Sequence, residues 1–350
     1  MSGIQRFAYE LVRSLDSLLS SGRVIDQGMQ VELLVPRNAS LEVPLNRIKL
    51  KRVGRLTGHA WEQLELPVYS KGNLLFTPSG GAPVIHDQHV MIMADAAVFA
   101  ASEGYSWRYS LWYRWLFRRM GKKARDILTI SKFSEHELQT WCLIPSDKIT
   151  VTSAGCEHIL RSAPDLSILD KHGLGQKPFV LAVGSLNPNK NLKGIAEAIR
   201  LMHSQPLTFA LAGGVNASVF SHHTLPGNVV RLGFVTDAQL RALYENALCF
   251  VFPSFYEGFG IPPLEAMTCG CPVVVGRAAS LPEVCGEAAL YCDPMRPADI
   301  AAKIRQFAEN PAMRVQFIER GKIHAQRFTW ERVAEDTWSV LKRVIGESSL

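Results

Sequence analysis

A strand, a glycine turn and a helix start follow one another between residues 249 and 267, and this stretch constrains the fold most. The apolar run Cys249–Phe252 predicts a buried strand that ends before a proline. Gly258 and Gly260 allow a tight turn whose backbone N–H groups can approach a ligand. Pro262 and Pro263 mark a helix start, where the positive dipole end favours a negative group. The stretch therefore predicts an anion site, suited to a phosphate, at the end of a strand.

Two carboxylates flank the predicted anion site. Glu257 precedes the turn and Glu265 lies in the first helical turn, with seven residues between them. Because carboxylate and phosphate repel, each is expected instead to accept hydrogen bonds from a vicinal diol of a ribose or a hexose. A ligand with sugar, diphosphate and ribose is a nucleotide sugar. The local pattern is explained equally well by an alternative in which Glu265 only favours the helix start and Glu257 is only solvated.

Strand and helix patterns alternate along both halves of the chain. In the second half, apolar runs at 179–184, 207–212 and 229–235 predict strands, and Thr236 with Gln239 predicts a capping box for the next helix. In the first half, strands are predicted at 31–35, 74–76, 84–86 and 127–130, and Ser134 is predicted to cap a helix. Continuous apolar strands separated by helices predict parallel sheets covered on both faces, with ligands at the carboxyl ends of the strands.

Length and composition limit the architecture further. A chain of 350 residues is expected to form two domains. Prolines and glycines cluster near 161–177, which predicts a linker there. We therefore expect an N-terminal domain at 1–165, a C-terminal domain at 166–330 and a final helix at 331–350 that packs back on the first domain.

The composition also excludes several classes of protein. A hydrophobic content of 47% with 20% charged residues is typical of a folded globular protein. No apolar run reaches the roughly 18–20 residues of a membrane span. Seven irregularly spaced cysteines indicate reduced thiols, and the absence of a second pair at zinc spacing predicts no metal site. The net charge of +6 is too mild to indicate a nucleic-acid partner.

The paired glutamates around Gly-Phe-Gly resemble the motif of glycosyltransferase family 4, retaining enzymes of the GT-B fold. Residues 269–275 and 280–289 are similar to the segments that follow it in the family, and the likeness runs from about residue 3 to about residue 338. The resemblance implies an α/β protein of two Rossmann-like, doubly wound parallel-sheet domains facing a cleft. It also implies metal-independent transfer of a hexosyl unit, without a cofactor, from GDP-mannose (slightly favoured) or a UDP-sugar. The acceptor would be a growing, lipid-linked glycan of O-antigen or exopolysaccharide.

The resemblance also assigns roles to residues. Lys190 would neutralise the diphosphate leaving group, and Glu257 and His86 would complete the catalytic set. His86 with Asp87 is similar to a His-Asp pair that follows a strand in the family. The residues expected to bind the donor are Gly3, Ser185, Val235, Asp237, Gly258, Phe259, Gly260, Ile261 and Glu265.

Several of these residues have simpler interpretations. Lys190 could be an ordinary surface lysine and His86 a structural histidine. Asp237 could accept hydrogen bonds from guanine N1 and N2, but a helix cap is favoured for it. Ser185 and Asn189 stand where many relatives carry an arginine, so a second cation is missing from the pattern.

The amino-terminal region departs from the family. Relatives begin with a strand that leads into a glycine loop, whereas this chain opens at the loop itself, residues 2–7. The first strand of the N-terminal domain is therefore missing from the pattern. A start site assigned too far downstream is the expected cause, with a truncated enzyme as the alternative.

Residues 105–123 mix aromatic side chains with cations and contain no acidic residue. This pattern fits equally an amphipathic helix on an anionic membrane surface and a core helix with a solvated cationic face. We expect a cytoplasmic protein, peripheral on the inner face of the cytoplasmic membrane. Two rival functions remain open on the sequence: a nucleotide-sugar epimerase of GT-B-like fold, and a catalytically silent nucleotide-sugar-binding protein.

Overall fold

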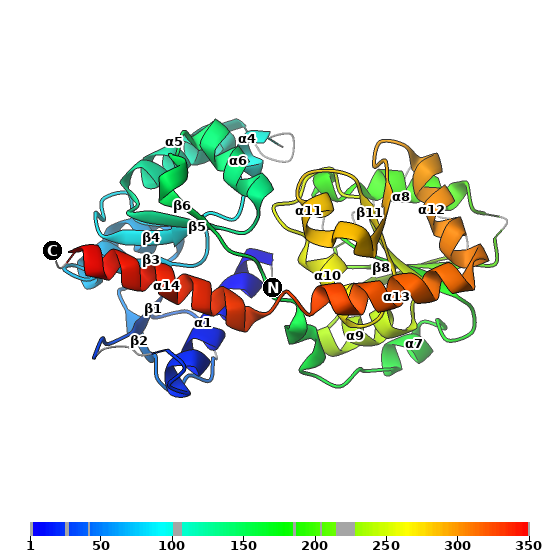
Figure 1. Ribbon diagram of the computed structural model, residues 1–350, viewed down its shortest axis with the longest axis horizontal. Coiled ribbons are helices and arrows are strands. Elements are labelled where there is room, and N and C mark those ends of the chain that lie inside the picture. The colour runs from blue at the N-terminus through cyan, green and yellow to red at the C-terminus, as the bar shows by residue number, and fades with distance from the viewer. Residues whose placement is uncertain are drawn as a thin grey trace. The chain divides into compact units, whose positions relative to one another are not determined.

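The computed structural model describes residues 3–24, 28–40, 43–100, 107–184, 187–203, 205–214 and 228–348. The chain divides into two compact units (Figure 1). Unit 1 comprises Met1–Gly155 with Thr329–Leu350, and unit 2 comprises Cys156–Phe328. Each unit contains parallel strands connected by helices, the architecture expected from the alternating sequence pattern.

Unit 1 begins with a long helix and ends with another. Its elements are α1 (Gly3–Ser20), β1 (Glu32–Pro36), β2 (Lys49–Val53), α2 (Gly58–Ala60), η1 (Trp61–Glu65), α3 (Leu66–Tyr69), β3 (Leu75–Thr77), β4 (His89–Ile92), α4 (Ala97–Ala100), α5 (Trp107–Lys123), β5 (Asp126–Thr129), α6 (Lys132–Cys142), η3 (Ser146–Lys148), β6 (Ile149–Val151) and α14 (Trp330–Ser348). Its strands form two separate parallel sheets, β1-β2 and β3-β4-β5-β6.

Helices α1 and α14 pack on each other within unit 1. Phe7 of α1 meets the fully buried Trp330 of α14 edge to face, with ring centroids 5.3 Å apart. On α1, Asp16 accepts hydrogen bonds from the backbone N–H groups of Asn46, Arg47 and Ile48, which anchors the segment that leads into β2. The final helix, assigned from the sequence to 331–350, thus lies in the same unit as the amino-terminal helix.

Unit 2 contains one continuous sheet. Its elements are η4 (Glu157–Leu160), α7 (Ser167–Lys171), β7 (Phe179–Val183), η5 (Pro188–Lys190), α8 (Leu192–Arg200), β8 (Thr208–Ala212), β9 (Val229–Gly233), α9 (Asp237–Asn246), β10 (Cys249–Phe252), α10 (Ile261–Thr268), β11 (Val273–Gly276), α11 (Leu281–Cys285), η7 (Gly286–Ala288), β12 (Ala289–Cys292), α12 (Pro297–Glu309) and α13 (Pro311–Ala325). The strand order is β12-β11-β10-β7-β8-β9, and every pairing is parallel. Strands β7, β8, β10 and β11 are almost fully buried on both faces, as their continuous apolar sequences require, whereas the edge strand β9 is partly exposed.

The structure corrects two local predictions in unit 1. The predicted strand at 84–86 is wrong, because this segment is a turn in which the His86 N–H donates to Pro83 O, and the strand begins only at His89. The predicted cap Ser134 is also wrong. Ser131 caps α6 one turn earlier, and its side-chain oxygen accepts a hydrogen bond from the Ser134 N–H. The capping box of Thr236 and Gln239 at α9 is confirmed.

The boundary between the units falls after Gly155, earlier than the predicted 165. Residues 156–165 belong to unit 2 because they pack on it. His158 contacts Glu265, and the Asp165 N–H donates to Ala238 O. The segment 161–177 is therefore not a simple linker, since it includes α7.

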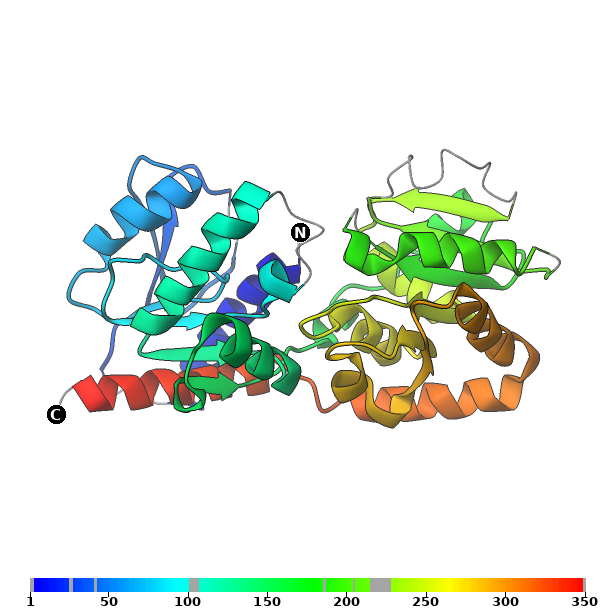
Figure 2. The same ribbon diagram turned by 90° about the horizontal axis from the view of Figure 1, so that it is seen from above.

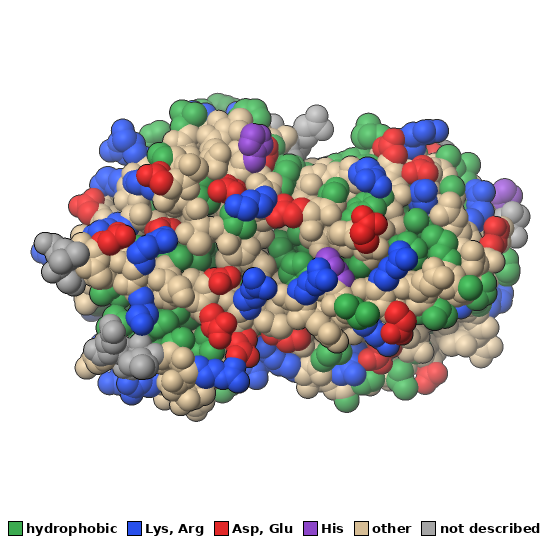
Figure 3. Space-filling model, in the orientation of Figure 1, with side chains coloured by type: hydrophobic (Ala, Val, Ile, Leu, Met, Phe, Trp, Pro, Cys, Tyr) green, Lys and Arg blue, Asp and Glu red, His purple; other side chains and the backbone are tan. Residues whose placement is uncertain are grey.

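One face of the surface carries charges of both signs. On the face that carries α13 and α14, acidic and basic side chains are interspersed (Figure 3). Among the residues that the structure describes, no helix is long and apolar enough to span a membrane.

Candidate active site

The turn that follows β10 is held in a single shape. Gly260 is the N-cap of α10 and has φ 110°, a left-handed conformation that favours glycine. A Cβ at this position would also lie 2.7 Å from Leu281 Cδ2. The Ser280 hydroxyl hydrogen-bonds to Glu257 O at 2.8 Å and to Phe259 O at 2.9 Å. These two contacts hold the backbone of the turn in place. The amino end of α10 is thus fixed next to Glu257.

Lys190 and Glu257 meet at the carboxyl ends of neighbouring strands. The Lys190 ammonium donates to Glu257 Oε1 at 2.7 Å and lies 4.7 Å from the centroid of the Phe252 ring. The loop that carries Lys190 follows β7, which pairs directly with β10. Both side chains are only partly buried, so the pair remains accessible to a ligand. The geometry brings a cation, a carboxylate and a helix amino end into one place.

Asn191 fixes the loop that carries Lys190. It adopts a left-handed conformation with φ 54° and caps α8 by accepting the Gly194 N–H. Its side-chain amide donates to Pro253 O at 3.1 Å and to Pro294 O at 2.7 Å. The buried amide thereby connects the start of α8 with the end of β10. These hydrogen bonds fix the position of the neighbouring Lys190.

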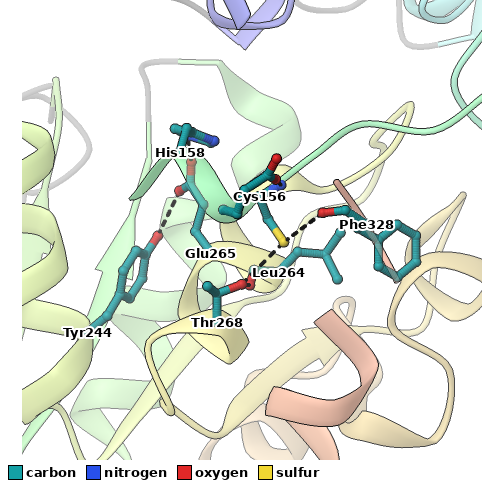
Figure 4. A network of polar contacts seen from close by, with 8 residues as sticks. Cys156, His158, Tyr244, Leu264, Glu265, Thr268 and Phe328 are labelled. Carbon is teal, nitrogen blue, oxygen red and sulfur yellow. Dashed lines mark hydrogen bonds and ion pairs between the residues drawn. The ribbon is translucent and has the colours of Figure 1, made fainter. Parts of the chain in front are cut away.

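Glu265 is held by two buried side chains that sequence reasoning missed (Figure 4). The His158 Nε2–H donates to Glu265 Oε1 at 2.8 Å, and the Tyr244 hydroxyl donates to Oε2 at 3.4 Å. Burial, and next the negative charge of Glu265, raises the pKa of Tyr244 well above its usual range, so the phenol remains a donor. Each carboxylate oxygen can accept a further hydrogen bond, which leaves capacity for a diol.

Neither partner could be identified from a local sequence pattern. His158 lies in η4, ahead of the predicted domain boundary, and Tyr244 lies within α9. Their convergence on Glu265 depends on three segments, η4, α9 and α10, that are distant in sequence.

The remaining residues predicted to bind the donor in unit 2 lie near the ends of β9 and β10. Gly258, Phe259 and Gly260 are buried, and Ile261 is the first residue of α10. Val235 and Asp237 flank Thr236, the N-cap of α9. The favoured role of Asp237 as the cap is therefore wrong, since Thr236 caps and Asp237 is the first helical residue. Ser185 lies outside the described residues.

Phe234 is a further residue of this region that the sequence analysis did not select. Its side chain is 89% exposed, directly after β9 and beside Val235. An aromatic side chain this exposed offers a flat apolar surface on which a base can stack.

The structure gives His86 a structural environment. It is buried, its Nδ1 accepts the Gln88 N–H at 3.3 Å, and its Nε2 lies 3.4 Å from Ser70 O. It precedes β4, whereas the resemblance requires a histidine that follows a strand. The predicted strand at 84–86 is a turn, so a catalytic role for His86 is supported by the resemblance alone and stays a prediction.

Gly3 is the exposed first residue of α1, and no atom lies within 4 Å of a Cβ built on it. Within the described ranges, no cluster of histidine, cysteine, aspartate and glutamate is arranged to hold a metal ion.

Comparison with known proteins shows the family of this chain. Residues 167–324 match the family model of glycosyl transferases group 1. The chain is 31% identical over 370 residues to O-antigen chain mannosyltransferase B of Escherichia coli, covering 98% of this chain and 96% of that protein.

Solved structures support the fold. The model is similar to sucrose-phosphate synthase from Thermosynechococcus elongatus (TM-score 0.74, 19% identity, 96% of this chain and 93% of that one). It is also similar to WaaG, a glycosyltransferase involved in lipopolysaccharide biosynthesis (TM-score 0.70, 17% identity, 97% and 96%). These likenesses show that each unit is a Rossmann-like domain of the GT-B fold.

Proposed function

The chain belongs to the group 1 glycosyltransferases of bacterial surface-polysaccharide synthesis, and from this premise we propose that it transfers a mannosyl unit from GDP-mannose to a lipid-linked O-antigen glycan. The observation that carries the proposal is the contact between Lys190 and Glu257 beside the amino end of α10. The name of the Escherichia coli relative supports mannose as the sugar.

Lys190 is proposed to stabilise the leaving diphosphate. Negative charge grows on the phosphate oxygens as the bond to the sugar breaks, and an ammonium fixed in advance stabilises that charge without reorganisation. The N–H groups at the start of α10 add donors on the same side. When the donor binds, the diphosphate takes the place of Glu257 at the ammonium, and Glu257 turns to hydroxyl groups of the sugar.

The nucleoside is proposed to lie between Glu265 and the end of β9. Glu265 would accept from the ribose hydroxyls, oriented by His158 and Tyr244. Phe234 would stack on the base, and Asp237 would accept from guanine N1 and N2, a pair of donors that uracil lacks. This arrangement supports a guanine nucleotide.

We infer from the family that transfer retains the anomeric configuration and needs no metal. The sugar–phosphate bond loosens, and a donor phosphate oxygen takes the proton of the acceptor hydroxyl on the same face of the sugar. The protein would then contribute positioned cations and amides rather than a nucleophile, which fits Lys190 and the turn before α10.

Helix α5 supports a peripheral membrane location. Trp107, Trp112 and Trp115 are 71%, 52% and 49% exposed, and the last two stack with ring centroids 5.2 Å apart. Arg119 and Lys122 are exposed on the same helix. Aromatic and cationic side chains together favour an anionic lipid surface, where a lipid-linked acceptor would be found.

Three cations of α5 form hydrogen bonds or ion pairs within unit 1. Arg114 donates to Val98 O and Phe99 O at 3.3 Å. Arg118 donates to Trp141 O at 3.0 Å, and Lys123 pairs with Asp87 at 3.0 Å. Membrane binding is therefore assigned to Arg119, Lys122 and the exposed tryptophans rather than to the whole basic segment.

The function is tested by incubating the protein with radiolabelled GDP-mannose and, separately, UDP-glucose, each with and without a lipid-linked mannan acceptor. We expect label in the lipid fraction only with GDP-mannose and acceptor, an α linkage by NMR, and no loss in EDTA. Epimerised sugar without acceptor would identify an epimerase instead. Saturable binding without turnover would identify a binding protein, and an EDTA-sensitive rate would overturn metal independence.

A further inference from the structure

Ser254 lies between the end of β10 and Glu257, inside the candidate site of unit 2 (the yellow-green strand β10 in Figure 2). The residue is 0% exposed, yet its Oγ has no hydrogen-bond partner among the described residues. Buried polar groups are nearly always paired, because a hydroxyl that loses its water without compensation costs free energy. The contacts within the described chain therefore leave this hydroxyl with unused hydrogen-bonding capacity.

The backbone around Ser254 is extended and is held from both sides. Toward β7, Pro253 O accepts a hydrogen bond from the loop at 187–191 at 3.1 Å, and the Phe255 N–H donates to that loop at 2.9 Å. Toward β11, a Cβ built on Gly276 would lie only 2.7 Å from Ser254 O, so glycine allows this close approach. The position of Ser254 is thus fixed between its two neighbours in the sheet.

The side chain of Ser254 lies on the same face of the sheet as Lys190. Alternate residues of an extended chain share a face, so Ser254 follows Phe252 and Phe250, whose rings stack at 5.8 Å. The Lys190 ammonium lies on this face, 4.7 Å from the centroid of the Phe252 ring. Helix α9 covers the same face, where Tyr244 meets Phe250 edge to face.

We propose that Ser254 is a further residue that binds the donor, and that its hydroxyl donates a hydrogen bond to the diphosphate. This inference rests on the proposed function, in which the diphosphate takes the place of Glu257 at the Lys190 ammonium. The exchange brings anionic oxygens to the face of the sheet on which the hydroxyl lies. A hydrogen bond to an anion is stronger than one between neutral groups, so the buried hydroxyl gains the partner that it otherwise lacks.

The unpaired state of the hydroxyl distinguishes a binding role from a structural one. A serine that serves the fold has its partner within the chain, and its loss lowers stability. The Ser254 hydroxyl has no such partner among the described residues, so its removal should cost the ligand-free protein nothing. Its removal should instead weaken the complex with any ligand that carries the diphosphate.

The test replaces the hydroxyl alone. Ser254→Ala should leave Tm unchanged or slightly higher, while the Kd for GDP, measured by calorimetry, rises about tenfold or more. The Kd for guanosine, which carries no phosphate, should not change when it is measured by ligand-observed NMR. Ser254→Cys fills the same site with a weak donor and should lose GDP affinity as the alanine variant does, which separates the hydroxyl from packing.

The matched control is Ser131→Ala in unit 1. Ser131 is also buried, at 1% exposure, but its oxygen accepts the Ser134 N–H and caps α6. This variant should show the opposite pattern, a Tm lower by about 2–4 °C and an unchanged Kd for GDP.

Four outcomes count against the inference. Unchanged GDP binding in Ser254→Ala would overturn it and leave the proposed function intact. Equal losses of GDP and guanosine binding with a lower Tm would show that Ser254 is structural. A loss confined to GDP-mannose, with GDP binding unchanged, would assign the hydroxyl to the sugar instead of the diphosphate. A wild-type protein that binds neither GDP nor UDP would refute the proposed function as well.

Discussion

Among the described residues, each unit contains six sheet strands, but the two units connect them differently. In unit 2, β7 to β12 pair without interruption, whereas in unit 1 the six strands are divided into a sheet of two and a sheet of four. The continuous sheet places the loop after β7 and the turn after β10 side by side, and this adjacency brings Lys190 to Glu257. In unit 1 the divided sheet encloses a cavity instead.

The difference shows what a continuous parallel sheet contributes to function. Neighbouring strands in one register bring residues from distant parts of the sequence to a common edge. Unit 2 therefore carries the polar groups proposed for donor binding, while unit 1 is distinguished by a cavity lined by β1 and β3 and by the exposed aromatic side chains of helix α5.

The largest expected effect tests whether the two units are independent folding units. Trp330→Ala should lower the free energy of unfolding by about 3–5 kcal/mol, because it empties a fully buried site against Phe7 in unit 1. Hydrogen exchange should rise in β1 to β6 first. Nucleotide binding by unit 2 should persist at temperatures where unit 1 has opened.

The matched control is Trp112→Ala, which removes a half-exposed tryptophan of the same unit and should change stability by less than about 0.5 kcal/mol. Simultaneous loss of protection in both units of the Trp330 variant would show that the chain unfolds as one body.

The next largest effect concerns the site of unit 2. Lys190→Ala should lower kcat by about 10²–10³-fold with a smaller change in KM, because the ammonium acts mainly on charge that develops in the transition state. Lys193→Ala, three residues along and exposed on α8, is the control and should leave kcat unchanged. An unaltered kcat in the Lys190 variant would remove this residue from the mechanism.

Glu265 should affect stability and binding together. Glu265→Ala leaves the buried His158 and Tyr244 without their acceptor and should cost about 1–3 kcal/mol of unfolding free energy. The Kd for GDP, measured by calorimetry, should also rise. Tyr244→Phe separates the two effects, because it removes one bond to Glu265 but keeps the carboxylate. If both variants bind GDP equally well, Glu265 has only a structural role.

Sequence reasoning was most successful where one local segment determines the geometry. The turn before α10 depends on Gly260 and on a helix start within a few residues, and the capping box of α9 depends on Thr236 and Gln239 alone. Strands β7 to β10 of unit 2 were predicted to within about two residues because each is a short, mainly apolar run.

Prediction failed where tertiary contacts, rather than the local sequence, determine the structure. The run at 84–86 is apolar enough for a strand, but a turn forms there and the sheet instead uses 89–92. The contacts of Glu265 with His158 and Tyr244 join residues that are 107 and 21 positions away, and no local pattern encodes them. The boundary at 155 was missed for the same reason, since the packing of 156–165 on unit 2 is not visible in its composition.

A smaller effect should distinguish the surfaces of the two units. Reversing Arg119 and Lys122 to glutamate should weaken partitioning onto vesicles containing anionic lipid by about tenfold or more, since each cation near the surface contributes about 1 kcal/mol. Lys322→Glu with Arg327→Glu, exposed in unit 2, is the matched control and should change little. Sedimentation with the vesicles measures both. Equal losses in the two pairs would mean that net charge, rather than α5, governs binding.

The smallest effect depends on pH and should have opposite signs in the two units. Burial raises the pKa of Asp126 in unit 1 above its ordinary value of 3.8, despite the contacts with Arg343 and Thr150. The native state therefore binds the proton more tightly than the unfolded chain. This favourable contribution is complete below pH 3.8 and is lost as the pH rises through the folded pKa.

Asparagine carries no charge to bury, so Asp126→Asn should raise the unfolding free energy at pH 7 by up to about 1 kcal/mol and change it little at pH 3.5. In unit 2, hydrogen bonds from Ser167 lower the pKa of Asp165, so its contribution is present at neutral pH and is lost as the pH falls. Asp165→Asn should then lower stability at pH 7. Urea unfolding of both variants at the two pH values measures the signs. A loss of stability at pH 7 in the Asp126 variant would show that the ion pair with Arg343 outweighs the cost of burying the carboxylate.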